Sequence, residues 1–358
     1  MNITIVGCGN VGTQFAVHCA AKGHQVTMFC SKPEMVSKEL CIVNAEGDVT
    51  LSGSLLCATN SPDVACQNAD LIFVTVPAFA MKSYAEKIIP HLKNSAMICL
   101  TPGTGGAEFA FKPALEKNCI IVGLQRVPSV ARLVEYGKKV CAVGYRDELF
   151  CATIPSQYSN IAAQTITDIF DITCTPMPNY LNVTLTPSNP ILHTTRLRTI
   201  FKDYKNNSYY EDVPLFYEGW DDESSKLLLK CDNEVQNICR ALKEFDLSYV
   251  KSLMLHYESE TPEQLTQKIK SIKSFRGLKS PCLQTELGFI PDFSSRYFTA
   301  DFPYGLSILV QISNLLNLEC PYMQKTLDWY YDIVQKNDEF SFDNYDINTV
   351  SDLINFYK

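Results

Sequence analysis

The first half of the chain alternates short apolar runs with stretches of helical periodicity. A strand is expected over residues 172–177, and earlier apolar runs predict strands over residues 2–7, 25–30, 55–59, 71–76, 96–101, 120–123 and 139–144. The helical patterns cover residues 11–22, 80–92, 108–116 and 148–170. Because strands that alternate with helices pair in parallel, this half predicts an α/β domain with a mostly parallel sheet and helices on both faces.

The pattern changes near residue 180. Four prolines fall between residues 176 and 190, which indicates a domain boundary. Strands are few beyond it, and amphipathic patterns predict helices over residues 224–245, 262–271, 304–316 and 321–335. We therefore predict an α/β domain over residues 1–182, followed by an all-α domain over residues 183–358.

Composition and charge narrow the class of protein. Hydrophobic residues make up 46% and charged residues 20% of the chain, which is typical of a globular enzyme in water. The net charge is −8, and residues 181–358 alone carry 18 Lys and Arg against 25 Asp and Glu. An acidic chain without a basic stripe argues against nucleic acid and anionic membranes as partners.

Further features of the sequence bear on the cellular location of the protein and on whether it binds a metal. No apolar run has the length of a bilayer span, and the first residues enter a strand without the basic start of a signal peptide. The fifteen cysteines form no C-x-x-C pair and mostly fall in apolar patterns, so we expect buried free thiols in a reducing compartment. No His/Cys cluster has metal-ligand spacing. We predict a cytoplasmic protein without a metal.

A glycine motif stands between the first predicted strand and the first predicted helix. Gly7, Gly9 and Gly12 form a G-x-G-x-x-G pattern. These glycines suit a tight turn, a close approach of the backbone to a pyrophosphate, and close packing of the helix on the strand. The start of the helix, at Asn10 and Val11, offers N–H groups to the phosphates. We predict a Rossmann βαβ unit that binds a nicotinamide dinucleotide.

The end of the second predicted strand bears on the choice of dinucleotide. NAD sites usually place an acidic residue there for the ribose 2′-hydroxyl, and this chain has Cys30 instead. Ser31 and Lys32 follow, and they could bind a 2′-phosphate. We therefore favour NADP(H) over NAD(H), although Lys32 is equally compatible with a solvated loop lysine. FAD is a weaker interpretation, because flavin sites also tend to place an acidic group at this position.

Two segments after later strands are further candidates for cofactor binding. Val76 and Pro77 follow the fourth predicted strand, and Thr101 and Pro102 follow the fifth. In an open α/β sheet the ligand lies outside the carboxyl ends of the strands, so both segments are expected near the nicotinamide. A simple turn is the alternative for residues 102–106.

The predicted helical domain holds two groups of residues with chemical potential. Asn189 and Pro190 suit the start of a helix, which places His193 in its first turn as a candidate general acid–base. Further on, Arg296 suits a substrate carboxylate, and Asp301 is a candidate partner for a histidine. The sequence also allows a packing histidine, a surface ion pair at Arg296 and a helix cap at Asp301.

Together these motifs resemble the octopine/nopaline (opine) dehydrogenase family. The matching segments follow the family's order and are the glycine motif, residues 102–106, 189–193, 216–219, Arg296 and residues 301–305. The resemblance implies a Rossmann domain and a helical domain with the active site between them. It also implies reductive coupling of an amino acid to a 2-keto acid such as pyruvate, with NAD(P)H. His193 would be the acid–base, Asp301 its partner, and Arg296 the group that holds the keto acid.

Two alternatives stay open. One is a 2-keto-acid reductase similar to ketopantoate reductase, which shares the two-domain plan and would use a lysine as acid–base. The other is a protein that senses NADP(H) without catalysis. Gln125, Arg126 and Arg132 could face the active site or the surface. The partners expected are small-molecule substrates, and the sequence leaves open whether the chain forms a homodimer.

Overall fold

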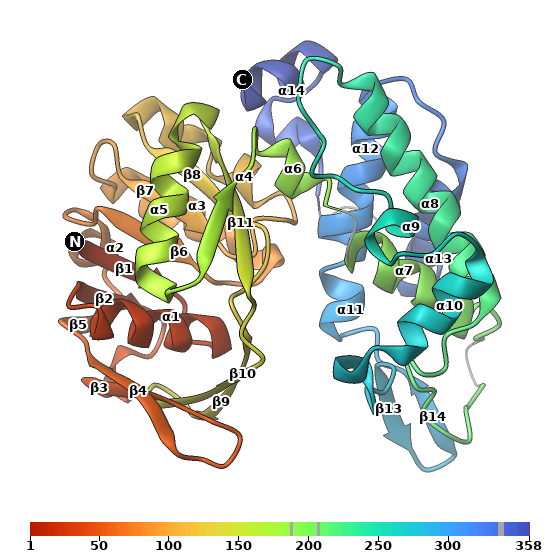
Figure 1. Ribbon diagram of the computed structural model, residues 1–358, viewed down its shortest axis with the longest axis horizontal. Helices are drawn as coiled ribbons and strands as arrows, with labels where there is room; N and C mark the ends of the chain where they lie inside the picture. Colours follow the sequence, from red (N-terminus) through yellow and green to blue (C-terminus); the bar gives the residue numbers. More distant parts are fainter. Residues whose placement is uncertain (187–188, 206–207, 336–339) are drawn as a thin grey trace. The chain divides into compact units, whose positions relative to one another are not determined.

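A computed structural model describes residues 1–186, 189–205, 208–335 and 340–358, and it divides the chain into two units (Figure 1). Unit 1 comprises residues Met1–Thr184 and Leu353–Lys358, and unit 2 comprises Leu185–Asp352. The chain therefore leaves unit 1 once and returns to it with its last residues. The domain predicted over residues 183–358 includes these last residues, whereas in the structure they pack with unit 1.

Unit 1 is built on an eight-stranded sheet. The strand order is β12 (Thr173–Pro176), β11 (Glu148–Ile154), β8 (Ile120–Leu124), β7 (Met97–Leu100), β6 (Leu71–Val74), β1 (Asn2–Val6), β2 (Gln25–Phe29) and β5 (Cys57–Thr59). All pairs are parallel except β8 with β11. The helices of this unit are α1 (Asn10–Ala21), α2 (Pro62–Cys66), α3 (Met81–Ile88), α4 (Ala107–Ala110), α5 (Ser159–Phe170) and α6 (Leu181–Thr184). The predicted α/β domain with a mostly parallel sheet is confirmed.

The strand register brings the predicted cofactor segments to one edge of this sheet. Val6 at the end of β1 pairs with Phe29 on β2 and with Val74 on β6, and Val74 pairs with Leu100 on β7. The loops that follow these four strands therefore leave the sheet side by side. The strand order also reverses at β1, and such a switch point is where open α/β sheets bind ligands.

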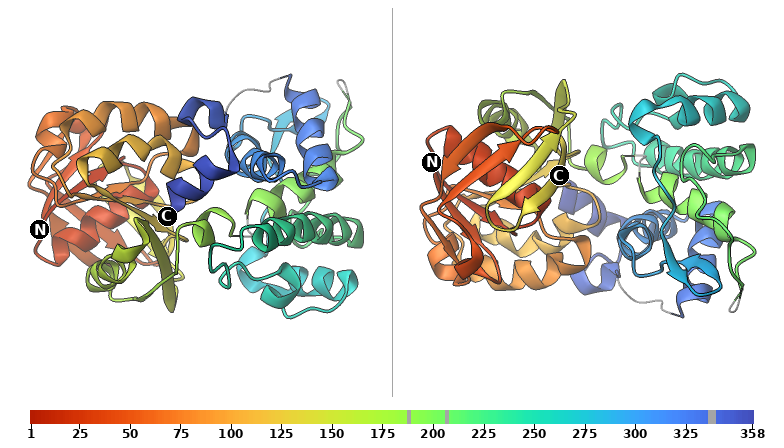
Figure 2. Two further views of the ribbon diagram at one scale, coloured as in Figure 1. Left: turned by 90° about the horizontal axis from the view of Figure 1, so that it is seen from above. Right: turned by 90° about the horizontal axis from the view of Figure 1, so that it is seen from below.

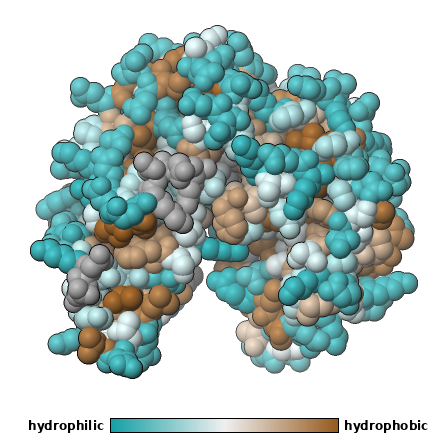
Figure 3. Space-filling model, turned by 180° about the vertical axis from the view of Figure 1, so that it is seen from behind, coloured by the Kyte–Doolittle hydropathy of each residue, from teal (hydrophilic) through white to brown (hydrophobic). Residues whose placement is uncertain are grey.

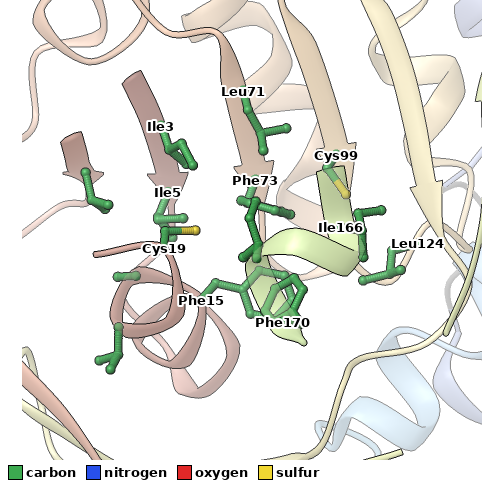
Figure 4. Packing of buried hydrophobic residues seen from close by; sticks show 14 of the residues in the cluster. Ile3, Ile5, Phe15, Cys19, Leu71, Phe73, Cys99, Leu124, Ile166 and Phe170 are labelled. Carbon is green, nitrogen blue, oxygen red and sulfur yellow. The ribbon is translucent and has the colours of Figure 1, made fainter. Parts of the chain in front are cut away.

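Helix α1 packs under this edge in an apolar core (Figure 4). The rings of Phe15 on α1, Phe73 on β6 and Phe170 on α5 meet edge to face, with Phe15 centroids 5.0 Å from Phe73 and 4.6 Å from Phe170. Phe15 and Phe73 are fully buried, and a buried side chain of this size contributes about 1.5–3 kcal/mol. The core thus fixes the helix whose start was predicted to face the phosphates.

A second sheet of four strands covers the other side of α1. Its strand order is β4 (Val49–Ser54), β3 (Glu39–Val43), β10 (Lys139–Val143) and β9 (Val130–Glu135). Helix α1 contacts both sheets, which explains why it is apolar nearly all round. The strand expected over residues 139–144 is therefore real, but it belongs to this small sheet. Strands β3, β4 and β9 were not predicted; β4 and β9 are largely exposed, whereas β3 is a mostly apolar and buried run of five residues.

The predicted helix over residues 148–170 is wrong in its first part. Residues 148–154 form the buried strand β11, and only Ser159–Phe170 form a helix. A short apolar run fits a buried strand as well as a helix, so periodicity could not decide between them. Pro155, which directly follows β11, is the signal that should have ended the predicted helix at that point.

Unit 2 consists mainly of helices. They are α7 (Asn189–Phe201), α8 (Asp222–Ala241), α9 (Leu253–His256), α10 (Pro262–Ser271), α11 (Arg296–Thr299), α12 (Ser307–Leu315) and α13 (Pro321–Val334). Helices α8 and α10 run side by side in both views of Figure 2. The expectation of an all-α domain needs one correction, because β13 (Cys282–Thr285) and β14 (Gly288–Pro291) form an antiparallel hairpin.

The structure also shows the character of the surface and the state of the cysteines. Hydrophilic side chains cover much of the face of each unit seen in Figure 3, with smaller apolar areas between them. Among the described residues, no helix is both long and apolar enough to cross a bilayer. All fifteen cysteines are free thiols, and ten of them are buried.

The segment that leaves unit 1 and the segment that returns to it both bind one buried carboxyl group. Glu108 on α4 is fully buried, and its Oε1 accepts hydrogen bonds from Thr184 Oγ1 at 2.6 Å and from Tyr357 OH at 2.9 Å. Thr184 is the last residue before the chain leaves unit 1, and Tyr357 ends the returning helix α14 (Val350–Tyr357). Burial raises the pKa of Glu108 from 4.5 to about 7.

This pKa makes the stability of the protein depend on pH. Between pH 4.5 and 7 the folded state holds a proton on Glu108 that the unfolded state has lost, so stability falls as pH rises through this window. Glu108→Gln cannot ionise. We therefore expect its free energy of unfolding, relative to the wild type, to increase by up to about 3 kcal/mol from pH 4.5 to pH 8. Urea unfolding at both pH values measures this, with the exposed Glu116→Gln as control. A constant difference between Glu108→Gln and wild type would contradict the prediction.

Candidate active site

The glycine motif has the geometry of a phosphate cradle. Gly7 directly follows β1 and has a φ of +105°, which favours glycine. A Cβ atom on Gly12 would collide with the carbonyl oxygen of Gly7, so the helix can approach the strand only without a side chain here. A Cβ on Gly9 would meet nothing within 4 Å. The space in front of Gly9 is therefore open, as a bound pyrophosphate would require.

The start of α1 completes this cradle. Its first turn contains no acidic residue, so the positive end of the helix dipole stays available for an anion. The side chain of Asn10 is directed elsewhere, because its Oδ1 accepts a hydrogen bond from Leu133 N at 2.8 Å and so ties the loop to β9. Asn10 can thus serve a phosphate through its backbone, as can Val11. These residues fit a dinucleotide.

The end of β2 combines buried and exposed residues. Cys30 is buried, and its thiol donates a hydrogen bond to the sulfur of Cys8, which lowers the pKa of Cys8 and raises that of Cys30. Ser31 and Lys32 are exposed. Of the three residues predicted at this position, only Ser31 and Lys32 offer side chains to a ligand from outside.

The two other predicted cofactor segments lie after β6 and β7. Val76 is buried and Pro77 is partly exposed. Thr101 is also buried, and its hydroxyl lies 3.7 Å from the sulfur of Cys99, so it is directed toward the protein interior. Pro102 is exposed. At Thr101 only the backbone could therefore contact a ligand.

In unit 2 the structure brings His193 and Asp301 together. His193 lies on α7 and is 8% exposed, and its Nδ1 is 2.8 Å from Oδ2 of Asp301. Its other ring nitrogen, Nε2, lies 2.9 Å from the hydroxyl of Tyr217. The three side chains thus form a hydrogen-bonded chain centred on the imidazole.

Asp301 and Tyr217, the two partners of His193, bear on where the protons of these hydrogen bonds lie. The carboxylate of Asp301 can only accept, so Nδ1 carries the proton and donates it. Burial raises the pKa of Tyr217 well above its usual value, and the nearby Tyr297, Tyr257 and Asp301 raise it further. The hydroxyl therefore keeps its proton, which it can donate to a bare Nε2. With Nδ1 directed to Asp301, the second ring nitrogen, Nε2, faces the Tyr217 hydroxyl.

Aromatic rings fix the plane of the imidazole. Phe216 packs edge on to His193 with a centroid distance of 5.4 Å, and Tyr297 lies 4.7 Å away on a tilted plane. Phe275 in turn stacks on Tyr217 at 4.0 Å. With little freedom for these rings, the histidine can hold its hydrogen bonds without a further loss of entropy.

Asp301 reaches His193 because the backbone changes its winding there. Helix α11 ends at Thr299, and Phe302–Leu306 form a π-helical turn in which Leu306 N donates to Asp301 O at 2.8 Å. Pro303 lies in this turn. The Asp301 side chain makes no cap hydrogen bond, although a cap was the alternative weighed for it. Its carboxylate is thus free to bind the imidazole.

Sequence reasoning missed the residue that positions Tyr217. Arg196 lies one turn after His193 on α7 and is buried. Its guanidinium donates to Phe216 O at 2.9 Å and to Asp221 Oδ2 at 3.0 Å, and it also bonds Gly219 O. Arg196 therefore holds the loop that carries Tyr217 against the helix that carries His193. Tyr217 itself stood in a recognised motif without an assigned role.

The remaining candidates are placed less tightly. Arg296 is exposed at the start of α11, next to Tyr297, which packs on His193. In unit 1, Gln125 and Arg126 are partly exposed after β8, and Arg132 is exposed on the small sheet. No cluster of three or more His, Cys, Asp or Glu in the described part of the chain could hold a metal ion.

Comparison with known proteins gives matches along most of the chain. Residues 176–334 match the family described as NAD/NADP octopine/nopaline dehydrogenase, alpha-helical domain. Residues 3–132 match the family of ketopantoate reductase PanE/ApbA. The two matches thus fall in the N-terminal α/β region and in the region that includes most of unit 2.

Individual relatives cover nearly the full length. An opine dehydrogenase from Haliotis discus hannai is 30% identical over 364 residues, which span 91% of this chain and 89% of the relative. A tauropine dehydrogenase from Arabella iricolor is 27% identical, over 78% of this chain and 74% of the relative. In fold, the chain is similar to octopine dehydrogenase with NADH and L-arginine (TM-score 0.87, 22% identity) and with NADH and pyruvate (TM-score 0.86, 23% identity), over 99% of this chain and 98% of that one.

Two glycine variants test whether each glycine of the cradle leaves space for the ligand or allows the helix to pack on the strand. Gly9 has an extended backbone that any residue adopts and open space around it, so Gly9→Ala should keep the thermal midpoint of the wild type. Its methyl group would occupy the ligand's space, and we expect dinucleotide affinity to fall about tenfold or more. Gly12→Ala should instead lower the midpoint, because its methyl group collides with Gly7. Fluorescence titration with NADPH and NADH, beside thermal unfolding, checks both variants. Unchanged cofactor affinity in a folded Gly9→Ala would refute this assignment.

Proposed function

This chain belongs to the opine dehydrogenase family, and on that premise we propose that it couples the amine of an amino acid to a 2-keto acid with NAD(P)H. The product is a secondary amine between two carboxylic acids, formed by reduction of an imine. The observation that carries this proposal is the hydrogen-bonded chain of Tyr217, His193 and Asp301. Imine formation needs a group that can give and take protons, and this chain supplies one.

We assign the proton transfers to His193. After the amine attacks the keto carbon, the carbinolamine must lose its hydroxyl as water, and an acid that protonates this hydroxyl speeds the step by about 10²–10⁴. Protons reach Nε2 by way of the Tyr217 hydroxyl, which contacts it. Asp301 stabilises the imidazolium that forms when Nε2 takes up a proton. The exposed guanidinium of Arg296 is assigned to the carboxylate of the keto acid.

The dinucleotide is assigned to the cradle of unit 1, with Gly7, Gly9 and Gly12 around its pyrophosphate. When bound, it supplies the hydride that reduces the imine carbon. We propose NADP(H) as the preferred form. Cys30 offers no carboxylate to a ribose 2′-hydroxyl, whereas the exposed Ser31 and Lys32 can bind a 2′-phosphate through a hydroxyl and a positive charge.

A simple keto-acid reductase is the second candidate, because residues 3–132 match the ketopantoate reductase family. That match covers the part of the chain assigned to the cofactor, where the two reactions make the same demands. They differ in one requirement. A keto-acid reductase oxidises NADPH without an amine, and an opine dehydrogenase does not.

A matrix assay tests the proposal. Oxidation of NADPH and of NADH is followed with pyruvate, oxaloacetate or 2-oxoglutarate, each with and without the individual amino acids. We expect turnover only when a keto acid and an amino acid are both present, and a higher kcat/KM for NADPH than for NADH. Keto-acid reduction without any amine would overturn the opine reaction. Equal or better rates with NADH would overturn the cofactor preference alone.

Variants of the histidine then assign the acid–base. His193→Gln keeps a polar side chain but cannot transfer protons, so kcat should fall by about 10²–10⁴ while affinity for the dinucleotide stays unchanged. The matched control is His256→Gln, an exposed histidine of the same unit, which should keep wild-type turnover. Nearly full turnover in His193→Gln would refute the role. If neither wild type nor variants turn over with any substrate pair although NADPH binds, the protein is a sensor.

A further inference from the structure

Unit 2 contains a basic groove that the proposed reaction does not use. It has a volume of about 620 Å³ and lies among helices α7, α8 and α13. Arg198 and Lys202 line it from the end of α7, Lys226 and Lys230 from α8, and Lys325 from α13. Arg198 is five residues beyond His193, which turns it by about 140° around the helix axis. The groove therefore faces a different side of α7 from the imidazole.

The spacing of these cations brings like charges close together, which destabilises the folded protein when no anion is bound. Arg198 and Lys202 are four residues apart, as are Lys226 and Lys230, so each pair lies on one face of its segment and repels itself. The two pairs line the same groove, and Lys325 adds a fifth positive charge. This concentration occurs in the acidic half of the chain, where residues 181–358 carry 25 acidic against 18 basic side chains. Such a segregation of charge is expected where an anion binds.

Protein carboxylates neutralise only part of this charge. Lys202 pairs with Glu223 at 2.6 Å, and Lys226 lies 4.0 Å from Glu263. Two of the other three cations make contacts that leave their charge in place, and the third lies in solvent. Arg198 donates to Thr326 Oγ1 at 3.0 Å, Lys230 lies 4.5 Å from the centroid of the Tyr322 ring, and Lys325 is exposed. Among the described residues that line the groove, Glu223 is the one carboxylate.

We propose that this groove binds a small anion with at least two phosphoryl groups. Four of its five cations are lysines, which bind phosphoryl oxygens as compact point charges, and the planar fork of the one arginine also matches a phosphoryl group. The site is separate from the dinucleotide cradle in unit 1 and does not depend on the opine reaction.

Titration calorimetry with inorganic tripolyphosphate tests the proposal. NADPH is added only to the concentration that fills the glycine cradle, so that the cradle does not bind the probe and little free NADPH, which also carries phosphoryl groups, competes for the groove. We expect one tripolyphosphate per chain, with affinity that falls as salt is raised. Lys325→Glu should weaken this binding about tenfold or more, since it replaces a cation that faces the anion by a like charge. The matched control is Lys243→Glu, the same change at an exposed lysine of unit 2 that does not line the groove, and it should shift the affinity less than about twofold.

Three results would overturn the proposal. The first is an absence of binding by the wild-type protein, and the second is equal affinity in Lys325→Glu and Lys243→Glu. The third is citrate binding as tightly as tripolyphosphate, which would rule out a preference for phosphoryl groups. Lys230→Ala gives a second, milder variant, and its thermal midpoint is measured to show that any loss of binding occurs in a folded protein. Turnover in the matrix assay is not needed for any of these outcomes.

Discussion

The hydrogen bond between His193 Nδ1 and Asp301 Oδ2 joins residues 108 positions apart, and much of the helical unit serves to make it. Helix α7 presents the imidazole, while a π-helical turn after α11 directs the carboxylate toward it. A hydrogen bond to a charged group contributes about 1.5–3 kcal/mol, and here it also selects a tautomer. Without it, the imidazole could turn its basic nitrogen away from Tyr217, and the proposed proton transfer would lose its direction.

The same arrangement explains why a buried arginine lies so close to the histidine. The guanidinium of Arg196 donates its hydrogen bonds to the loop of residues 216–221 rather than to a substrate. Gly219 lacks a side chain where the guanidinium approaches it. This contact holds Tyr217 at Nε2, while Asp301 holds Nδ1. The two nitrogens are therefore fixed by independent parts of the chain, and a change in either part should alter the histidine without touching it.

Features with a local cause could be predicted from the sequence. The glycine motif, the parallel strands around it and the long helices of unit 2 all follow from short patterns, and the structure has them. The small sheet, the strand β11 and the last helix α14 depend on contacts with distant segments, and local periodicity does not report those. The pairing of His193 with Asp301 came from the family resemblance, since no spacing rule links residues so far apart. Arg196 gave no local signal for its role.

Asp301 directs the proton of the His193 ring to Nδ1, which leaves Nε2 as the nitrogen that exchanges protons. Nitrogen-15 NMR of protein labelled at histidine measures this directly, because protonated and bare ring nitrogens differ in chemical shift. With five histidines in the chain, the spectrum of His193→Gln assigns the signals of His193. In the neutral ring we expect the proton on Nδ1 and a bare Nε2, and loss of this preference in Asp301→Asn. A resting His193 with its proton on Nε2 would contradict it.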